Sequence, residues 1–493
     1  MTDRQKYRLL EMLPGLTIWS LFIGAIILSF LKPYWVIYFM ILLALFWLMR
    51  IAYSLIFLII SWSKFRKVEK INWLARCQTL SNWQKIYHLI FLATYKEEVD
   101  VVENSFKSLL RANYPLDKLI VVLAGEERDQ ERFLRNAAIV QEKYGSKIFK
   151  FIFTLHPKNL PNEIPGKGSN LNWSGHRAKE IIDQMKIPYQ DIVVSTFDID
   201  TCVHPQYFAY LTYKYLTAPN PTRASYQPVA IFNNNIWESP AISRVVSRGT
   251  TFWLLSELAK PDRLFTFSSH SMSFRALVDI DFWQKDVVSE DSRIFLQCFN
   301  YYNGDYRVEP LYISVSMDTV YCGSFWRTII NQYRQQRRWA YGMENFPYMA
   351  WYFVKNKKMP WTRKLPFIWK QFEGGCSWAS SPILILIFGW LPIWIAGQRG
   401  ETAAVIQNAP FILEQLLTIS MVGLFVSAIL STALLPPRPT KYKSYKYFFM
   451  IIQWLLFPVT MIIFGAVPAT EALSRLMLGK YLGFHVTEKQ RNY

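Results

Sequence analysis

The stretch Ile192-Val193-Val194-Ser195-Thr196-Phe197-Asp198-Ile199-Asp200 decides how the rest of the chain is interpreted. Four of the five residues 192–196 are apolar or β-branched, which predicts a buried strand. Ligands of open α/β sheets bind beyond the carboxyl ends of the strands, where Asp198 and Asp200 fall. Two carboxylates at such an end suit a hard divalent cation that also holds a substrate diphosphate. Alone, an Asp-x-Asp sequence is more often a solvated turn, so other stretches must decide.

The composition indicates a membrane protein with more than one domain. Of 493 residues, 52% are hydrophobic, 17% aromatic and only 18% charged, which predicts membrane segments. The net charge of +19 suits an anionic membrane face and a phosphorylated substrate. No nucleic acid is expected as a partner, because the aromatic residues fall in apolar runs rather than in a stacking groove. The five cysteines are scattered without a C-x-x-C pair, which argues against a disulfide framework or a zinc site.

Long apolar runs lie near both ends of the chain. Runs at 16–31 and 34–62, separated by Lys32-Pro33, predict a helical hairpin through a bilayer. We interpret it as an uncleaved anchor whose basic flanks are both cytoplasmic. The protein is therefore expected to be a multi-pass protein of the cell (inner or plasma) membrane. Three further apolar segments follow the central region, at 377–396, 411–435 and 447–467.

The region 65–320 has a different pattern of apolar and polar residues. Short apolar segments alternate with polar helical ones, which predicts a mostly parallel α/β sheet. Helices are expected at 99–111 and 130–144. The expected strands are 88–94, 119–123, 149–154 and 192–197.

Two loops near the predicted strand ends carry groups suited to a nucleotide diphosphate. Thr94-Tyr95-Lys96-Glu97 follows the first strand, so Tyr95 would stack on a base and Glu97 accept from it, although an ordinary polar loop fits equally well. Gly166-Lys167-Gly168 lets the backbone approach a ligand closely, with Lys167 as a charge for phosphate. The chain has neither a Walker loop nor a Rossmann G-x-G-x-x-G sequence.

Two later stretches carry candidate proton-transfer groups. His270 lies among small polar and aromatic residues that would line a pocket, yet a lone histidine is more often structural. Ser289-Glu290-Asp291 reads as a helix start, with Ser289 as N-cap and two acids that complement the helix dipole. The functional alternative is a general base that takes a hydroxyl proton in a partly closed apolar site.

The segment 326–353 predicts a long aromatic and basic helix. Gln335, Arg338 and Trp339 share one face of it. An arginine fork suits a diphosphate, and an indole gives a flat surface on which a sugar ring stacks. An amphipathic helix lying on the membrane is the alternative, and both interpretations are compatible.

Taken together, these stretches resemble membrane-embedded family 2 glycosyltransferases of the cellulose, chitin and hyaluronan synthase type. The similar segments occur in the family order, and they are 94–97, 167–172, 198–200, 289–291, 335–339 and 484–489. The resemblance implies an α/β GT-A (Rossmann-like) catalytic domain at the cytoplasmic face, together with an α-helical transmembrane region and interfacial amphipathic helices. It implies inverting transfer from a nucleotide sugar, usually UDP-linked, to a saccharide or glycolipid acceptor beside the lipid bilayer.

The resemblance also assigns roles. The implied cofactor is Mg²⁺ or Mn²⁺, held by Asp198 and Asp200, and catalysis falls to Asp291 with Glu290. Acceptor binding is assigned to Trp339, Gln335 and His270. Nucleotide-sugar binding is assigned to Thr94, Tyr95, Glu97, Lys167, Asp198, Arg338, Thr487 and Lys489. The implied regions are a transmembrane hairpin (1–64), the GT-A domain (65–323), interfacial helices (324–375), a C-terminal transmembrane region (376–470), and an amphipathic helix with a gating-loop-like tail (471–493).

Three departures from the family pattern matter. Ala124-Gly125-Glu126-Glu127 replaces the usual acidic pair with Gly-Ser, and Ser289 replaces a threonine. Two early and three late crossings would place Lys489 outside the cell, away from a nucleotide. We therefore expect one late segment not to cross, either broken at Pro458 or Pro468 or lying along the interface.

The leading hypothesis is a synthase that lengthens a polysaccharide or glycolipid. Export of the product by the same protein would be an additional function. The alternative enzyme is a single-transfer glycosyltransferase that acts on a lipid-linked acceptor. A transporter or binding protein is a different class and would need polar sites at the membrane midplane. Arg50 is the one charge well inside an early apolar run, so this class has less support.

Overall fold

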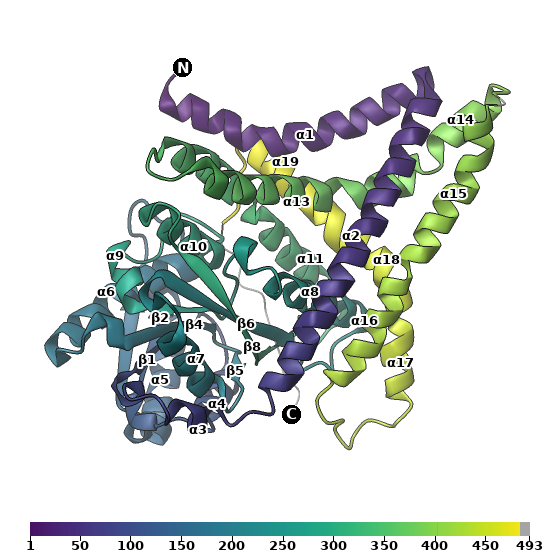
Figure 1. Ribbon diagram of the computed structural model, residues 1–493. Helices are drawn as coiled ribbons and strands as arrows, with labels where there is room; N and C mark the ends of the chain where they lie inside the picture. Colours follow the sequence, from purple (N-terminus) through teal and green to yellow (C-terminus); the bar gives the residue numbers. More distant parts are fainter. Residues whose placement is uncertain (402, 484–493) are drawn as a thin grey trace.

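The computed structural model describes residues 1–401 and 403–483. Its central feature is an eight-stranded sheet in the order β3-β2-β1-β4-β7-β6-β8-β5 (Figure 1). The strands are β1 (Tyr87–Ala93), β2 (Leu119–Glu126), β3 (Lys150–His156), β4 (Ile192–Asp198), β5 (Cys202–Val203), β6 (Ala224–Phe232), β7 (Ser271–Ser273) and β8 (Arg307–Met317). A mixed α/β fold is thus confirmed.

The first half of the sheet matches the sequence prediction closely. Strands β3, β2, β1 and β4 are parallel, and β1 pairs with β4 so that Ala93 lies opposite Asp198. The middle of β1 and all of β2 are buried, as expected for strands with helices on both faces. This register brings the loop after β1, which begins at Thr94, beside the aspartates that follow β4.

The second half of the sheet is mixed. The short strand β7 runs antiparallel to both β4 and β6, while β6 and β8 are parallel. The loop that precedes β7, residues 265–270, therefore lies against the carboxyl end of β4, where the backbone N–H of Thr196 donates to the carbonyl of His270 at 3.0 Å. This places Ser268 and His270 beside Asp198.

Helices surround the sheet and extend far beyond it (Figure 1). In the α/β domain, α8 packs on β6 and also against α2, which joins the domain to the long apolar helices. The helices are α1 (Asp3–Leu31), α2 (Pro33–Val68), α3 (Trp73–Cys77), α4 (Val99–Leu110), α5 (Gln130–Tyr144), α6 (Lys167–Met185), α7 (Tyr207–Thr217), α8 (Ala241–Leu258), α9 (Phe274–Asp279), α10 (Glu290–Tyr301), α11 (Phe325–Ala340), α12 (Asn345–Tyr348), α13 (Trp361–Phe388), α14 (Leu391–Gln398), α15 (Ala404–Ser420), α16 (Val422–Ala433), α17 (Lys446–Ile452), α18 (Phe457–Thr460) and α19 (Val467–Met477).

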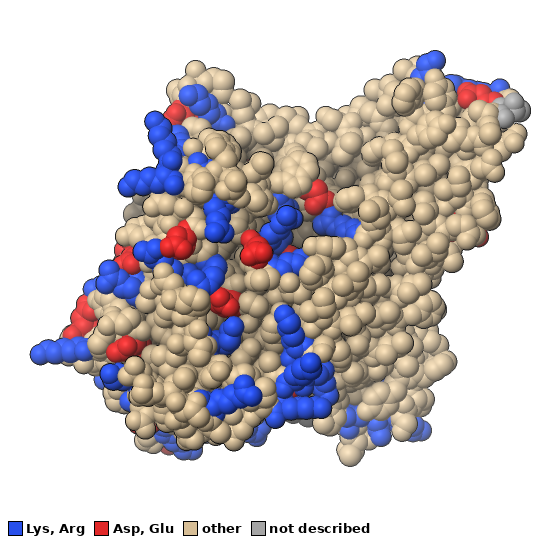
Figure 2. Space-filling model, in the orientation of Figure 1, with Lys and Arg blue, Asp and Glu red and all other residues tan. Residues whose placement is uncertain are grey.

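Five helical stretches in the described residues are long and apolar enough to cross a membrane. In Figure 1, α1 and α13 run side by side across the top, while α2 and α15 run steeply beside each other and meet them at the upper right. Figure 2 shows that charged side chains gather mainly over the α/β domain and leave most of the helical region uncharged. The five stretches are Asp3–Leu31, Pro33–Val68, Trp361–Gln398, Ala404–Ala433 and Lys446–Met477.

The late segment around Pro458 is helical but irregular. A 3-10 turn at Gln453–Leu456 precedes α18, and a π-helical turn at Met461–Ala466 follows it. The helix thus changes type near Pro458 without ending there. Whether this segment crosses a bilayer stays a prediction.

Candidate functional site

A cavity of about 1370 Å³ lies between the carboxyl ends of the parallel strands and the long apolar helices. The side chains predicted from three distant parts of the sequence meet there, including Asp200, Asp291 and Arg338. The predicted site residues that line the cavity are Thr94, Tyr95, Glu97, Lys167, Asp198, Asp200, Glu290, Asp291, Gln335, Arg338 and Trp339.

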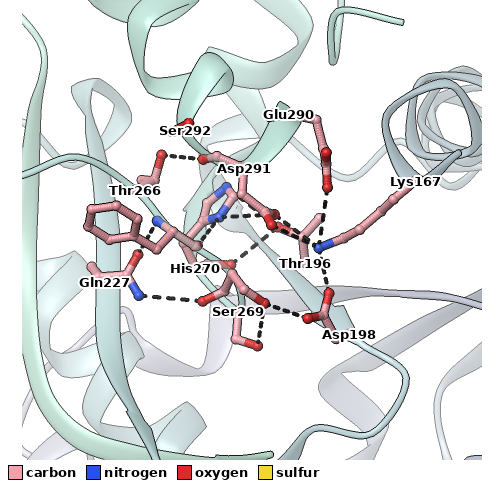
Figure 3. A network of polar contacts seen from close by, with 12 residues as sticks. Lys167, Thr196, Asp198, Gln227, Thr266, Ser269, His270, Glu290, Asp291 and Ser292 are labelled. Atoms are coloured by element: carbon pink, nitrogen blue, oxygen red, sulfur yellow. Dashed lines mark hydrogen bonds and ion pairs between the residues drawn. The ribbon is translucent and has the colours of Figure 1, made fainter. Parts of the chain in front are cut away.

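Lys167 joins the two groups of acids. It is the first residue of α6, and its ammonium nitrogen lies 2.7 Å from Oδ1 of Asp198. The same nitrogen lies 3.0 and 3.2 Å from the two carboxylate oxygens of Asp291 and 3.6 Å from Oε1 of Glu290. Figure 3 shows Lys167 reaching between Asp198 and the start of α10. One cation therefore contacts acids at the end of β4 and at the start of α10.

The electrostatics of this cluster follow from burial and crowding. Burial alone would lower the pKa of Lys167, but the carboxylates of Asp198 and Asp291 hold that pKa above its usual value. Burial and the neighbouring Asp291 raise the pKa of Glu290 to about 8. At neutral pH, Glu290 is therefore mainly protonated and suited to a supporting rather than a basic role.

Asp291 is contacted by two residues of the loop that precedes β7. The Thr266 hydroxyl donates to the Asp291 carbonyl at 2.6 Å, and Nδ1 of His270 lies 4.0 Å from the Asp291 carboxylate. His270 is fully buried and does not line the cavity; its Nδ1 is 2.9 Å from the carbonyl of Phe267. Burial lowers the pKa of His270, while Asp291 opposes this. The position of His270 thus suits support of Asp291 better than contact with an acceptor.

The start of α10 is fixed by Glu344, a residue that sequence reasoning missed. Its Oε1 accepts hydrogen bonds from the backbone N–H groups of Val288 and Ser289, at 3.0 and 2.8 Å, and from the Ser289 hydroxyl at 2.6 Å. Ser289 occupies the predicted N-cap position, but its side chain makes no capping bond to α10. Arg293 adds a second tie, because its Nε donates to Asn345 at 2.7 Å. These bonds position Asp291 from outside its own helix.

Asp198 and Asp200 provide the oxygen atoms expected of a cation site. Oδ2 of Asp198 accepts from the Ser268 hydroxyl at 2.8 Å, and Oδ2 of Asp200 accepts from the backbone N–H of Asp318 at 2.9 Å. The described residues contain no group of three or more His, Cys, Asp or Glu side chains placed to hold a metal ion. Two carboxylates that face a cavity fit a Mg²⁺-type ion whose other ligands are water and a substrate phosphate.

The loop after β1 is built around Glu97. Its Oε2 accepts from the Thr94 hydroxyl at 2.9 Å and from the backbone N–H of Tyr95 at 2.6 Å. Burial raises the pKa of Glu97 to about 7, although both hydrogen bonds oppose the shift. The Arg128 guanidinium lies 4.2 Å from the Tyr95 ring centroid. Lys96 lies between Tyr95 and Glu97 in the chain and has a left-handed φ of 71°. Such strained backbone conformations are common beside functional sites.

The segment 335–339 presents the predicted face to the cavity. Gln335, Arg338 and Trp339 all line it, and Trp339 packs on Phe232 with ring centroids 6.1 Å apart. Arg337 points elsewhere and pairs with Glu471 of α19 at 2.6 Å. The face predicted from i, i+3 and i+4 spacing therefore lies toward the cavity. Thr487 and Lys489, which were assigned to the nucleotide, lie outside the described residues.

Glu126 is the last residue of β2 and belongs to the segment 124–127, which departs from the family pattern. It is buried and accepts from Nε of Arg128 at 2.7 Å, so this ion pair lies at the edge of the cavity. Gly125 lies against Phe133 so closely that an added Cβ would come within 2.2 Å of its ring. The backbone at this strand end therefore packs directly on α5.

Comparison with known proteins supports an enzymatic assignment. The family model for glycosyl transferase family group 2 matches residues 193–465, more than half of the chain. Among solved structures, the mannosyltransferase PcManGT of Pyrobaculum calidifontis, in complex with GDP-Man and Mn²⁺, is 14% identical with a TM-score of 0.42, over 87% of this chain and 99% of that chain.

S. aureus TarS 1-349 in complex with UDP-GlcNAc is 12% identical with a TM-score of 0.31, over 67% of this chain and 91% of that chain. No curated protein matches the chain. The family match includes Asp198, α10 and the segment 335–339, whereas the loop 94–97 and Lys167 precede it. The chain therefore belongs to glycosyl transferase family group 2 and is a glycosyltransferase.

Proposed function

We propose that the protein transfers a sugar from a nucleotide sugar to a saccharide-bearing acceptor at the cytoplasmic face of the membrane, with inversion at the anomeric carbon. The donor proposed first is UDP-linked, on the resemblance to cellulose, chitin and hyaluronan synthases. One observation carries the proposal: Asp198, Asp200, Asp291 and Arg338 line one cavity at the strand ends, beneath apolar helices. Residues 65–323 would form the catalytic domain.

The donor would lie over the ends of β1 and β4. Tyr95 would contact the base, and the Thr94–Glu97 hydrogen bond would fix the loop around it. Arg338 and Lys167 offer positive charge to the diphosphate, and such charge stabilises the leaving group as it develops. Donor binding would draw Lys167 from Asp198 toward the diphosphate, which would leave this carboxylate oxygen to a divalent cation.

Asp291 would act as the general base. The acceptor hydroxyl oxygen forms a bond to the anomeric carbon while the bond from that carbon to the diphosphate oxygen breaks, and the hydroxyl proton passes to Asp291. Thr266 and Glu344 keep this carboxylate in place during the reaction. Trp339 would support the acceptor ring from below, with Gln335 beside it.

A divalent cation, Mg²⁺ or Mn²⁺, fits Asp198 and Asp200 by the nature of their oxygen ligands. When bound, such an ion supplies Lewis-acid stabilisation of the departing nucleotide diphosphate. Lys167 contacts Oδ1 of Asp198 at 2.7 Å. It therefore compensates the charge of this carboxylate.

The direct test is release of nucleotide diphosphate from a panel of UDP- and GDP-sugars by the purified protein in detergent. We expect release from at least one sugar, dependent on Mn²⁺ or Mg²⁺ and abolished by chelation. Absence of release from every sugar would refute the enzyme assignment to nucleotide sugars. Product size, by mass spectrometry, then separates extension of a polysaccharide from transfer of a single sugar.

A further inference from the structure

The cavity is larger than a nucleotide sugar requires. Its volume of about 1370 Å³ exceeds the roughly 300–1000 Å³ of typical small-ligand sites. The acids and Arg338 occupy the part next to the sheet. The remainder, here called the apolar wing, is lined by residues of the long helices: Ile51, Ser54, Leu55, Leu58, Ser377, Trp378, Leu417, Ser420, Met421, Leu424, Ser427, Phe457, Thr460, Met461 and Phe464.

Three of the five hydroxyl groups in the apolar wing are already bonded within the protein. The hydroxyl of Ser420 donates to the Leu416 carbonyl at 2.8 Å, and that of Thr460 donates to the Phe457 carbonyl at 2.8 Å. The Ser377 and Ser381 hydroxyls lie 3.3 Å apart and pair with each other. A glycan carries several hydroxyls per sugar, and burying them without partners is unfavourable. A hydrocarbon chain needs no such partners and fits this lining.

The charge nearest to the wing is already compensated. Arg50 of α2 lines the cavity, forms an ion pair with Glu373 of α13, and lies 5.3 Å from the Trp47 ring centroid. This pair joins helices on two sides of the cavity. Ionisable groups at such depths usually face the helix interior and pair with one another, so Arg50 does not make the wing a polar channel.

The helices that wall the wing also present apolar side chains outward. Ile56 of α2 and Phe425 of α16 are 58% and 62% exposed, and both belong to candidate membrane spans. In Figure 1, α2 and α13 converge at the upper right and diverge toward the α/β domain. Figure 2 shows a hollow near the middle of this face with charged side chains around it. The outer faces of the helices that wall the wing are thus apolar enough for contact with lipid.

We propose that the acceptor is borne on a lipid whose hydrocarbon chain lies in the apolar wing, with its head presented to Asp291 and Trp339. The inference rests on the proposed function, because Asp291 must act on the acceptor. The head hydroxyl oxygen then bonds to the anomeric carbon of the donor, the bond to the diphosphate breaks, and the proton goes to Asp291. The tail takes no part in the chemistry and supplies binding energy.

The test compares acceptors that differ only in the tail. Methyl, octyl and hexadecyl glycosides of one sugar are assayed with the full chain in lipid nanodiscs, with the donor that gives diphosphate release. Because each methylene buried in the wing adds binding free energy, kcat/KM should rise at least roughly tenfold from methyl to hexadecyl. Equal kcat/KM for all three glycosides would overturn the inference while leaving donor chemistry intact.

A pair of variants on one helix separates the wing from general effects of the bilayer. Ser54→Trp places a large side chain in the wing, whereas Ile56→Trp places it on the outward face. We expect Ser54→Trp to lower the ratio of hexadecyl to methyl kcat/KM at least roughly tenfold, and Ile56→Trp to leave it unchanged. An unchanged ratio in Ser54→Trp, or an equal fall in both variants, would contradict a tail site in the wing. Loss of diphosphate release in the unmodified protein would instead refute the proposed function.

Discussion

The ammonium nitrogen of Lys167 lies 3.0 Å from Oδ1 of Asp291, so the candidate base carries its own counter-ion. The same nitrogen contacts Asp198, at the end of a different element. The acids of the site are therefore grouped around one buried cation. Each carboxylate remains available to a second positive charge only if Lys167 moves or shares it.

Lys167→Met should damage both stability and activity. It leaves the carboxylates of Asp198 and Asp291 without their common cation, and removing one partner of a buried ion pair costs roughly 3–5 kcal/mol. We expect a lower melting temperature and at least a roughly hundredfold loss of kcat/KM. Lys158→Met is the matched control, because Lys158 is exposed and its ion pair with Glu127 is long, at 3.9 Å. Wild-type turnover in Lys167→Met would show that this cation is dispensable.

Glu344→Ala should act through the position of Asp291. Without the carboxylate, the N–H groups of Val288 and Ser289 lose their acceptor and the first turn of α10 loosens. We expect kcat to fall roughly tenfold or more with little change in donor KM, since misplacement of a reacting group lowers the rate of the chemical step.

Glu344→Gln keeps an acceptor oxygen at the same place and should recover most of the lost rate. Glu180→Ala removes an exposed ion pair with Arg177 and serves as a control. Rate loss of the same size in the Gln and Ala variants would argue against the positioning role of this residue.

Glu97 should make stability depend on pH in a defined window. Its pKa is raised from 4.5 to about 7 in the folded protein, so the folded state holds more protons than the unfolded chain between these values. The free energy of unfolding therefore decreases as pH rises from 4.5 through 7, by at most roughly 3 kcal/mol from this group. In Glu97→Gln this contribution disappears.

The measurement is the melting temperature of wild type and Glu97→Gln between pH 4.5 and 8. The variant should gain stability relative to wild type as pH rises. A constant difference across the window would mean that Glu97 titrates alike in the folded and unfolded states.

Trp339→Ala should weaken acceptor use more than donor binding. The indole lines the cavity and packs on Phe232, and loss of a stacking surface worth about 1.4 kcal/mol corresponds to a roughly tenfold rise in acceptor KM. Trp326→Ala, at the exposed start of the same helix, is the control. Equal weakening of donor binding would place the indole in the donor site instead.

The sequence predicts those parts of the fold whose signals are local. Strands β1, β2 and β4 are continuous buried runs, and the acids that follow β4 stand at a recognisable strand end. Strands β5 and β7 have only two and three residues. Such short segments show no periodicity, and their pairing is decided by the rest of the sheet.

The site was less predictable because its supports come from far along the chain. Ser289 matches a helix-capping pattern, yet its hydroxyl bonds to Glu344, 55 residues away. Nor does sequence spacing reveal that Lys167 reaches both Asp198 and Asp291, which needs α6 and α10 to lie side by side. Periodicity did place Arg338 and Trp339 on the face of Gln335, because spacings of three and four residues lie within a single helix.

The most direct test of the central claim is Asp291→Asn, measured by donor binding and sugar transfer on the same preparation. The change keeps the shape of the side chain and removes its ability to accept a proton. The account predicts that nucleotide-sugar binding by calorimetry in Mn²⁺ stays within a few-fold of wild type, while transfer falls at least roughly a hundredfold. Asp281→Asn, which changes an exposed acid, should match wild type in both. Transfer retained by Asp291→Asn would contradict the account.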